Sequence, residues 1–327
     1  MRYDIAVIGN DEAAFEMLTL AAASGKRSVA IIPEVRHSSW LVSQALRRLI
    51  TNLLVERTPS RKRMFANTGS PRLLQSLIAR SIVSELADQV NGLRDQNVDV
   101  LIGEADFVSS SELRVVGLAK ENRESVQADT IVVGTGVRKC PLHRPASVRR
   151  FFGPEKIFSS RHLPRNLCIV GGGQFGAGLA SLTSLFGTNT RHVARGDQAS
   201  VLQELCSASG VTIGHHPADV GLPSPGNDGI GSSFPIVDCR RSIGFTDHLN
   251  LESVFVEPDE NGQLWCAANF ETWATGVFGV GSVVGFSPDT ALHPSIQAER
   301  VMSQMSRRVK RPKMLDRKPG AQSFSAK

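Results

Sequence analysis

The chain has 327 residues, of which 41% are hydrophobic and 21% are charged, a composition that excludes global disorder and favours a folded protein of about two domains. Its net charge of +6 is confined to the end of the chain: residues 307–327 carry eight Lys or Arg and one acid, whereas residues 1–306 carry 29 basic and 30 acidic side chains. This charge distribution favours a solvated basic tail over a nucleic-acid-binding body, and binding of RNA or another anionic partner by the tail is the alternative.

The sequence contains no uninterrupted apolar stretch of the roughly 18 to 20 residues that a membrane helix needs, and its first residues do not resemble a signal peptide. We therefore expect a cytoplasmic protein with no membrane partner. Five cysteines occur without a C-x-x-C pair, so neither a redox pair nor a zinc ribbon is predicted.

Apolar periodicity predicts a strand–helix–strand unit at the start of the chain, in which Gly9 ends the first strand and Gly25 follows the helix. Further helices, a pair of strands and a buried strand follow. The predicted ranges are strand 3–9, helix 12–23, strand 28–32, helix 41–55, helix 72–92, strands 98–107 and 113–118, and strand 130–133.

A second strand–helix–strand unit begins at Asn166. Residues 207–234 are rich in Gly, Ser, Pro, Asp and His, and are predicted to form a loop. Within that loop His215, His216 and Asp219 could be read as metal ligands, but we interpret them as solvated residues and predict no metal site. The remaining predicted ranges are strand 167–170, helix 175–185, strand 190–194, strand 236–239, strand 276–281 and helix 294–307.

The strongest motif lies between the strand and the helix of the second unit. Gly171-Gly172-Gly173-Gln174-Phe175-Gly176 satisfies the pattern G-x-G-x-x-G. In that pattern the first glycine makes a tight turn, the second lets the backbone approach a pyrophosphate, and the third allows the helix to pack closely on the strand. This context predicts dinucleotide binding, and the alternative is a glycine-rich turn that only packs.

The end of the following strand bears on the choice between NAD and NADP. An acid there would bind the adenine ribose of NAD, but this chain has Ala194, with Arg191, His192 and Arg195 nearby. These residues favour NADP over NAD. The alternative is that no nucleotide binds.

The loop of the first unit keeps only the first glycine of the pattern. In Gly9-Asn10-Asp11-Glu12-Ala13-Ala14, Asp11 occupies the position of the second glycine. Together with Glu12 it would place carboxylates where a pyrophosphate should lie, which opposes phosphate binding. Glu34, one step beyond the usual acid position, is a candidate ribose ligand.

The order of these motifs, with Val133-Gly134-Thr135-Gly136 and the segment 277–285, resembles the flavoprotein disulfide-reductase superfamily. Within it the chain is most similar to the soluble pyridine nucleotide transhydrogenase branch. The closer resemblance rests on four segments and extends, with gaps, over about residues 3–303. The four segments are 42–47, 103–108, 244–249 and 261–264.

The resemblance implies an α/β fold with two Rossmann-like domains of the three-layer ββα type, which bind FAD and NAD(P). The family's C-terminal dimerisation domain is expected to be absent, as a departure from the pattern. It predicts an FAD-type domain at 1–150 and 248–306, a shortened NAD(P)-type domain at 151–247 and a basic tail at 307–327. The expected cofactor-binding residues are Gly9, Asn10, Ala13, Ala14, Glu34, Thr135, Gly136, Gly171, Gly173, Gln174, Phe175, Gly176, Arg195, Gly281 and Ser282.

The departures from the family pattern are also informative. Where the family carries a redox-active cysteine pair or its remnant, this chain has His37-Ser38-Ser39-Trp40, which predicts no disulfide chemistry. The family's lysine and glutamate near the flavin match Gln44 and Gly178, and its aspartate beside the ribityl chain matches Ser282. These positions leave the catalytic residues unassigned.

Two hypotheses follow. The first is an FAD- and NAD(P)-dependent oxidoreductase that transfers hydride between nicotinamide and flavin without a disulfide. The second is a non-catalytic dinucleotide-fold protein that acts as a binding or regulatory module. The sequence does not predict the oligomeric state.

Overall fold

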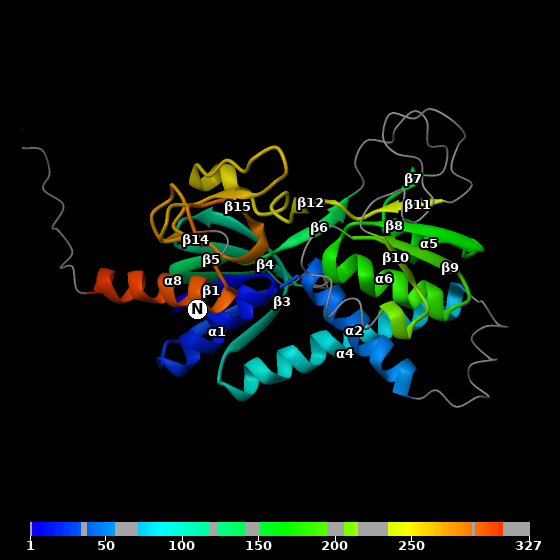
Figure 1. Ribbon diagram of the computed structural model, residues 1–327. Helices are drawn as coiled ribbons and strands as arrows, with labels where there is room; N and C mark the ends of the chain where they lie inside the picture. The colour runs from blue at the N-terminus through cyan, green and yellow to red at the C-terminus, as the bar shows by residue number, and fades with distance from the viewer. Residues whose placement is uncertain are drawn as a thin grey trace, which may run out of the picture.

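The computed structural model describes residues 2–33, 38–55, 71–117, 123–140, 151–194, 206–214, 235–289 and 292–309. The chain folds into two halves that lie side by side, each built on its own sheet (Figure 1). The prediction of an α/β fold with two Rossmann-like sheets is confirmed.

The first half is built on a six-stranded sheet. In it β1 lies between β2 and β5 and is parallel to both. All five residues of β2 are buried, as expected for an apolar strand covered on both faces. The strands are β1 (Arg2–Ile8), β2 (Ser28–Ile32), β3 (Asp99–Ser109), β4 (Glu112–Gly117), β5 (Arg123–Val133) and β14 (Val277–Gly279).

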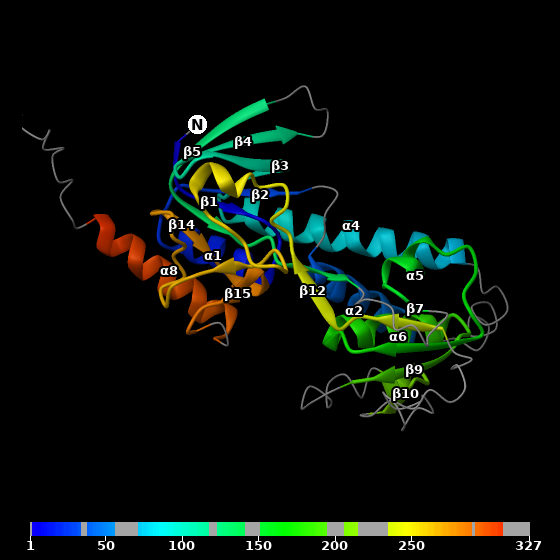
Figure 2. The same cartoon turned by 90° about the horizontal axis from the view of Figure 1, so that it is seen from above.

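The long strands β3 and β5 change partners along their length. Each pairs in parallel within the sheet at one end and antiparallel with β4 at the other, so that β3, β4 and β5 splay away from β1 (Figure 2). Helices α1 (Glu12–Ala23) and α8 (Pro294–Val309) pack together against the sheet. Because β14 pairs with β5, the C-terminal part of the chain re-enters the first sheet.

The second half contains a five-stranded parallel sheet with α6 (Gly173–Leu185) packed on it, and a short helix α5 (Glu155–Ser159). The strand order is β10 (Thr212–Gly214), β9 (Asn189–Val193), β8 (Asn166–Val170), β11 (Ile236–Asp238) and β7 (Phe151–Phe152). The loop prediction for 207–234 is wrong at β10, because a three-residue strand shows no periodicity and is defined by its pairing with β9. Residues 215–234 lie outside the described residues.

Two helices from the early part of the chain pack on the second half. They are α2 (Ser39–Val55) and α4 (Pro71–Asp95), and α2 lies against both α4 and α6. Leu46, Ile50 and Leu74 are fully buried in the same apolar cluster as Ile169 and Leu182. This cluster is the core of the second half and is called here the second core. Residues about a hundred positions earlier in the chain than its sheet therefore complete it.

An antiparallel ribbon of β6 (Val137–Cys140) and β12 (Arg241–Gly244) joins the two halves. β6 follows β5 of the first sheet, and β12 follows β11 of the second (Figure 1). The other short elements are η2 (Leu251–Val254), β13 (Leu264–Trp265), η3 (Gly281–Val283) and β15 (Val284–Phe286). Among the described helices, none has both the length and the apolar character that crossing a bilayer requires.

Candidate functional site

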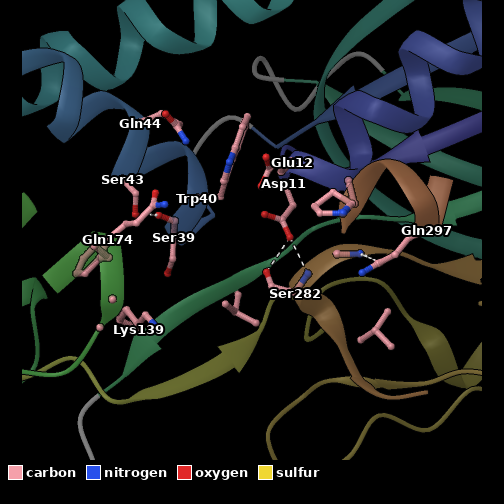
Figure 3. Close-up of a pocket in the computed structure, with 18 of the residues that line it drawn as sticks. Asp11, Glu12, Ser39, Trp40, Ser43, Gln44, Lys139, Gln174, Ser282 and Gln297 are labelled. Atoms are coloured by element: carbon pink, nitrogen blue, oxygen red, sulfur yellow. Dashed lines mark hydrogen bonds between the residues drawn. The ribbon is translucent and has the colours of Figure 1, made fainter. Parts of the chain in front are cut away.

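A cleft of about 830 Å³ lies between the two halves and is lined by residues of both (Figure 3). On one side, α1 contributes Asp11 and Glu12 at its start. On the other side, Lys139 of β6 and Arg240 contribute cations. The cleft is therefore acidic on its α1 side and basic on its α6 side.

The turn between β8 and α6, Gly171–Gly176, is called here the second turn. Gly171, Gly172 and Gly173 have φ angles of 70°, 87° and 53°, a region that glycine enters without strain. A Cβ at Gly176 would lie 2.0 Å from the carbonyl oxygen of Gly171, so that position cannot carry a side chain without a shift of the backbone. The residues of this turn that line the cleft are Gly172, Gly173, Gln174 and Phe175.

The second turn has the properties of an anion site. It opens onto the cleft at the N-terminus of α6, a helix of 13 residues whose first backbone N–H groups have no partner within the helix. Such N–H groups and the positive end of the helix dipole favour a bound phosphate. The strand, the glycine turn and the helix therefore lie where the motif predicts them, and dinucleotide binding at this turn stays a prediction.

The side chain of His192 contacts the second turn. Its Nε2 lies 3.1 Å from the carbonyl oxygen of Gly171, and 1% of the residue is exposed. Burial lowers the pKa of His192. We therefore correct the prediction that this residue is a cation beside the adenine ribose: it is a neutral imidazole whose Nε2–H donates to Gly171, with the tautomer assigned from that contact.

Two cations stand beside the second turn. The side chain of Arg240 lies against Gly171, and its Nε donates to Oδ1 of the buried Asp238 at 2.7 Å. Nζ of Lys139 donates to Oγ of Ser242 at 2.8 Å, and burial lowers the pKa of this lysine. Because β11 pairs with β8, Arg240 and the second turn meet at the carboxyl ends of neighbouring strands.

The loop of the first unit is tied to the protein itself. A Cβ at Gly9, where φ is 122°, would lie 2.2 Å from the carbonyl oxygen of Gly134. Asn10 is fully buried, its Oδ1 accepts from the backbone N–H of Ser38 at 3.3 Å, and its carbonyl accepts from the Ser38 hydroxyl at 3.1 Å. Gly9 and Asn10 therefore fix the loop and do not face the cleft.

Three turns meet beside the start of α1, and they contain Asp11, Gly136, and Gly281 with Ser282. Their junction is called here the first cradle, and the side chain of Asp11 fills it. Its Oδ2 accepts from the Ser282 backbone N–H at 2.8 Å and from the Ser282 hydroxyl at 2.7 Å (Figure 3). A Cβ at Gly281 would lie 2.6 Å from the same oxygen, and one at Gly136 would lie 3.1 Å from Cγ of Asp11. Burial raises the pKa of Asp11 despite these hydrogen bonds.

The predicted site residues divide into three groups. Those that line the cleft are Ala13, Gly173, Gln174, Phe175, Gly281 and Ser282. Those that shape the turns from behind the cleft are Gly9, Asn10, Ala14, Thr135, Gly136, Gly171 and Gly176. Glu34 and Arg195 lie outside the described residues, as do His215, His216 and Asp219.

The positions matched to the family's lysine and glutamate have different surroundings. Gln44 lines the cleft. Gly178 is buried, and a Cβ there would lie 3.2 Å from Cβ of Leu46, so this glycine lets α2 pack closely on α6. A charged side chain at 178 would meet an apolar residue.

Sequence reasoning missed several cleft residues. Lys139 lies within a short strand and Arg240 follows another, and the periodicity did not resolve either strand fully. The run Asp238-Cys239-Arg240 at the end of a buried strand is nevertheless a usable signal. Gln297 shares the buried face of α8 with Ala298 and Val301, and its Oε1 accepts from the Gly281 N–H at 2.8 Å. A glutamine on an otherwise apolar face could have indicated such a partner.

Among the described residues, no group of three or more His, Cys, Asp or Glu is placed to hold a metal ion. All five cysteines are described, and none forms a disulfide. Burial raises the pKa of Cys168, Cys239 and Cys266 to about 12, so these thiols are not nucleophiles near neutral pH.

A family model described as pyridine nucleotide-disulphide oxidoreductase matches residues 3–299. The soluble pyridine nucleotide transhydrogenase of Pseudomonas fluorescens strain SBW25 is 27% identical over 319 residues, covering 87% of this chain and 67% of that protein. The protein of the same name from Hahella chejuensis is 27% identical over 318 residues with the same coverage. The chain thus spans about two thirds of the length of these relatives.

Solved structures show the same fold. LpdA from Mycobacterium tuberculosis matches with a TM-score of 0.60 at 20% identity, covering 93% of this chain and 72% of that one. The flavoprotein disulfide reductase RclA from Escherichia coli, in its Cu(II) complex, matches with a TM-score of 0.58 at 18% identity, covering 92% and 70%.

Proposed function

The chain belongs to the pyridine nucleotide-disulphide oxidoreductase family, and from that premise we propose that it binds NAD(P)H in the cleft and oxidises it. Members of this family are FAD-dependent and bind NAD(P). One observation carries the proposal for this chain: the second turn, with three glycines at positive φ, opens at the start of α6 onto the cleft.

The residues around the second turn suit a pyrophosphate. Gly171 and Gly173 leave room for a close approach, and the N–H groups at the start of α6 are available as donors. Arg240 and Lys139 add positive charge on the same side. The nicotinamide end of the ligand would then extend toward Trp40 and Gln44.

We propose a preference for NADPH over NADH. The support is Ala194 at the end of β9, where an acid would repel a 2′-phosphate, and the half-buried Arg191 within the strand. His192 gives no support, because it is buried and neutral. The contribution proposed for Arg195 belongs to a residue outside the described part of the chain.

We also propose the domain division 1–150 and 248–306 for the FAD-type domain, 151–247 for the NAD(P)-type domain and 307–327 for the tail. It is supported by the pairing of β14 with β5 and by the separate sheet of β7 to β11. Helix α2 and part of α4 pack on the second core although they lie within 1–150.

The first cradle fits FAD less well. With the Asp11 carboxylate at the junction of the three turns, a cofactor pyrophosphate does not fit there, and we assign no step to FAD in this cradle. Hydride transfer between nicotinamide and flavin, without disulfide chemistry, is proposed on the family relationship and on the five cysteines, none of which forms a disulfide.

A second candidate is a non-catalytic binding module. Asp11 in the first cradle and the contact of Gly178 with Leu46 favour it, because both replace features that the resemblance associates with flavin chemistry. Under this candidate the second turn still binds a pyridine dinucleotide.

NADPH oxidation in the presence of added flavin separates the two candidates. For an oxidoreductase we expect the protein to accelerate loss of NADPH absorbance by at least about ten-fold over free flavin. Saturable NADPH binding without oxidation would support the binding module. Absence of NADPH binding would contradict both candidates, and a matched titration with NADH tests the cofactor preference.

A further inference from the structure

We infer that Asp11 is a built-in occupant of the first cradle: its carboxylate takes the place of a ligand phosphate, so the protein does not hold a flavin through a pyrophosphate. Any flavin that it uses is then an exchangeable ligand, bound without preference for FAD over riboflavin. This inference goes beyond the proposed function, which rests on the second turn and says of the first cradle only that a pyrophosphate does not fit there.

The first observation is the set of hydrogen bonds around Asp11. Its Oδ2 accepts two, from the backbone N–H and the hydroxyl of Ser282, at 2.8 and 2.7 Å. A backbone N–H donor directed at an anionic oxygen is the contact that a phosphate receives in a nucleotide-binding turn. In this protein the anion is supplied by the chain itself.

The second observation is the shape of the first cradle. Gly136 and Gly281, at φ of 71° and 75°, carry no side chain, and a Cβ at either position would crowd Asp11. Asp11 is 4% exposed, which shows how completely its side chain fills the space that these glycines leave. A pyrophosphate could enter only after this side chain had moved.

The third observation is charge. None of the ion pairs among the described residues includes Asp11, and Glu12 follows it at the edge of the same cleft. Where Asp11 is ionised, its carboxylate and that of Glu12 repel an incoming phosphate, and the repulsion is stronger where water is excluded.

The fourth observation concerns the two partners of the hydrogen bond. The family resemblance places a carboxylate at position 282 and a glycine at position 11. Here position 282 carries a hydroxyl and position 11 carries the carboxylate, and the two side chains are in direct contact. In this chain the carboxylate of the pair therefore stands at the start of α1, on the side of the first cradle where it blocks a phosphate.

The test compares equilibrium binding of FAD and riboflavin, because riboflavin has no phosphate. For the wild-type protein we expect FAD to bind no more than about three-fold tighter than riboflavin. For Asp11→Gly we expect FAD affinity to rise at least about ten-fold while riboflavin affinity changes by less than about three-fold. Asp11→Ala is the second variant, in case the glycine destabilises the loop.

Asp11→Asn is the matched control, because its amide fills the same space and its oxygen can still accept from Ser282. We expect its FAD affinity to lie between those of wild type and Asp11→Gly, because the amide removes the charge but still fills the space. A gain in Asp11→Asn equal to that in Asp11→Gly would overturn the claim that the side chain occupies the site. So would purified wild-type protein that carries stoichiometric FAD, or folded Asp11→Gly and Asp11→Ala that gain no FAD affinity.

NADPH titration of the same preparations keeps this inference separate from the proposed function. Loss of NADPH binding in all proteins would contradict the proposed function alone. A changed FAD-to-riboflavin ratio with unchanged NADPH binding would support the role of Asp11 alone.

Discussion

Asp11 and Ser282 lie 271 residues apart in the sequence and meet in a hydrogen bond of 2.7 Å between their side chains. Asp11 comes from the loop after β1, and Ser282 from η3 after β14. The bond therefore joins the loops that follow the first and the last strand, in chain order, of one sheet. The resemblance places a cofactor at this point. Its consequences can be measured in stability as well as in binding.

The substitution Asp11→Asn should change how stability depends on pH. Burial raises the pKa of Asp11 in the folded state, so the folded protein holds its proton to a higher pH than the unfolded chain. Stability should then fall as pH rises from about 4 toward the folded-state pKa, by up to about 1.4 kcal/mol per pH unit. Denaturant titrations across this range should show Asn gaining stability relative to Asp as pH rises; a constant difference would contradict the burial of a titrating carboxyl.

His192 should act in the opposite direction. Its pKa is lowered by burial, so on acidification the unfolded state takes up the proton first, and stability should fall below about pH 6.5. His192→Gln keeps an N–H donor for Gly171 but does not titrate, and should lack this loss. Denaturant titrations at pH 7.5 and 5.5 check the prediction, and equal pH dependence in the two proteins would refute it.

Lys139 should make NADPH affinity dependent on pH. Its charged form attracts phosphate, and burial lowers its pKa, so affinity should decline with rising pH before the ordinary lysine value of about 10.4 is reached. Lys139→Gln should bind NADPH about ten-fold more weakly at pH 7, because one charge-assisted contact is lost. Its NADPH affinity should not decline further as the pH rises above 7. Parallel pH profiles would show that this lysine does not contact the ligand.

Leu46 and Gly178 should be energetically coupled. Leu46→Ala removes a fully buried side chain and should cost about 2–5 kcal/mol of stability. Gly178→Ala places a methyl group 3.4 Å from Cδ1 of Leu46, a contact that Leu46→Ala removes, whereas its 3.2 Å contact with Cβ of residue 46 remains. The double variant should therefore be less destabilised than the sum of the single variants by about 0.5 kcal/mol or more. Simple additivity would argue against direct packing of α2 on α6.

The apolar runs of β1, β2 and β8 were predictable because buried parallel strands are continuous in the sequence, and Gly171–Gly176 was predictable because its glycines stand between a strand and a helix. The packing of α2 on the second core was not predictable, because periodicity shows which face of a helix is apolar but not what that face packs against. Position alone suggested that His192 was a cation, whereas burial makes it neutral.

The first cradle was also only partly predictable from the sequence. The repulsion between Asp11 and a phosphate followed from the loop sequence, but its contact with Ser282 depends on the return of the chain as β14. Lys139 lies within a strand of four residues and Arg240 follows a strand of three, and strands this short give no pattern that fixes where these side chains lie.

Calorimetric titration with NADPH tests the central claim most directly. We expect saturable binding to wild type and to the control Gly92→Ala, whose new Cβ meets nothing within 4 Å. We expect at least about a ten-fold weaker affinity for Gly176→Ala, in which the new Cβ would lie 2.0 Å from the Gly171 carbonyl oxygen and distort the second turn. Wild-type protein that binds no NADPH, or a folded Gly176→Ala that binds it like wild type, would contradict the account.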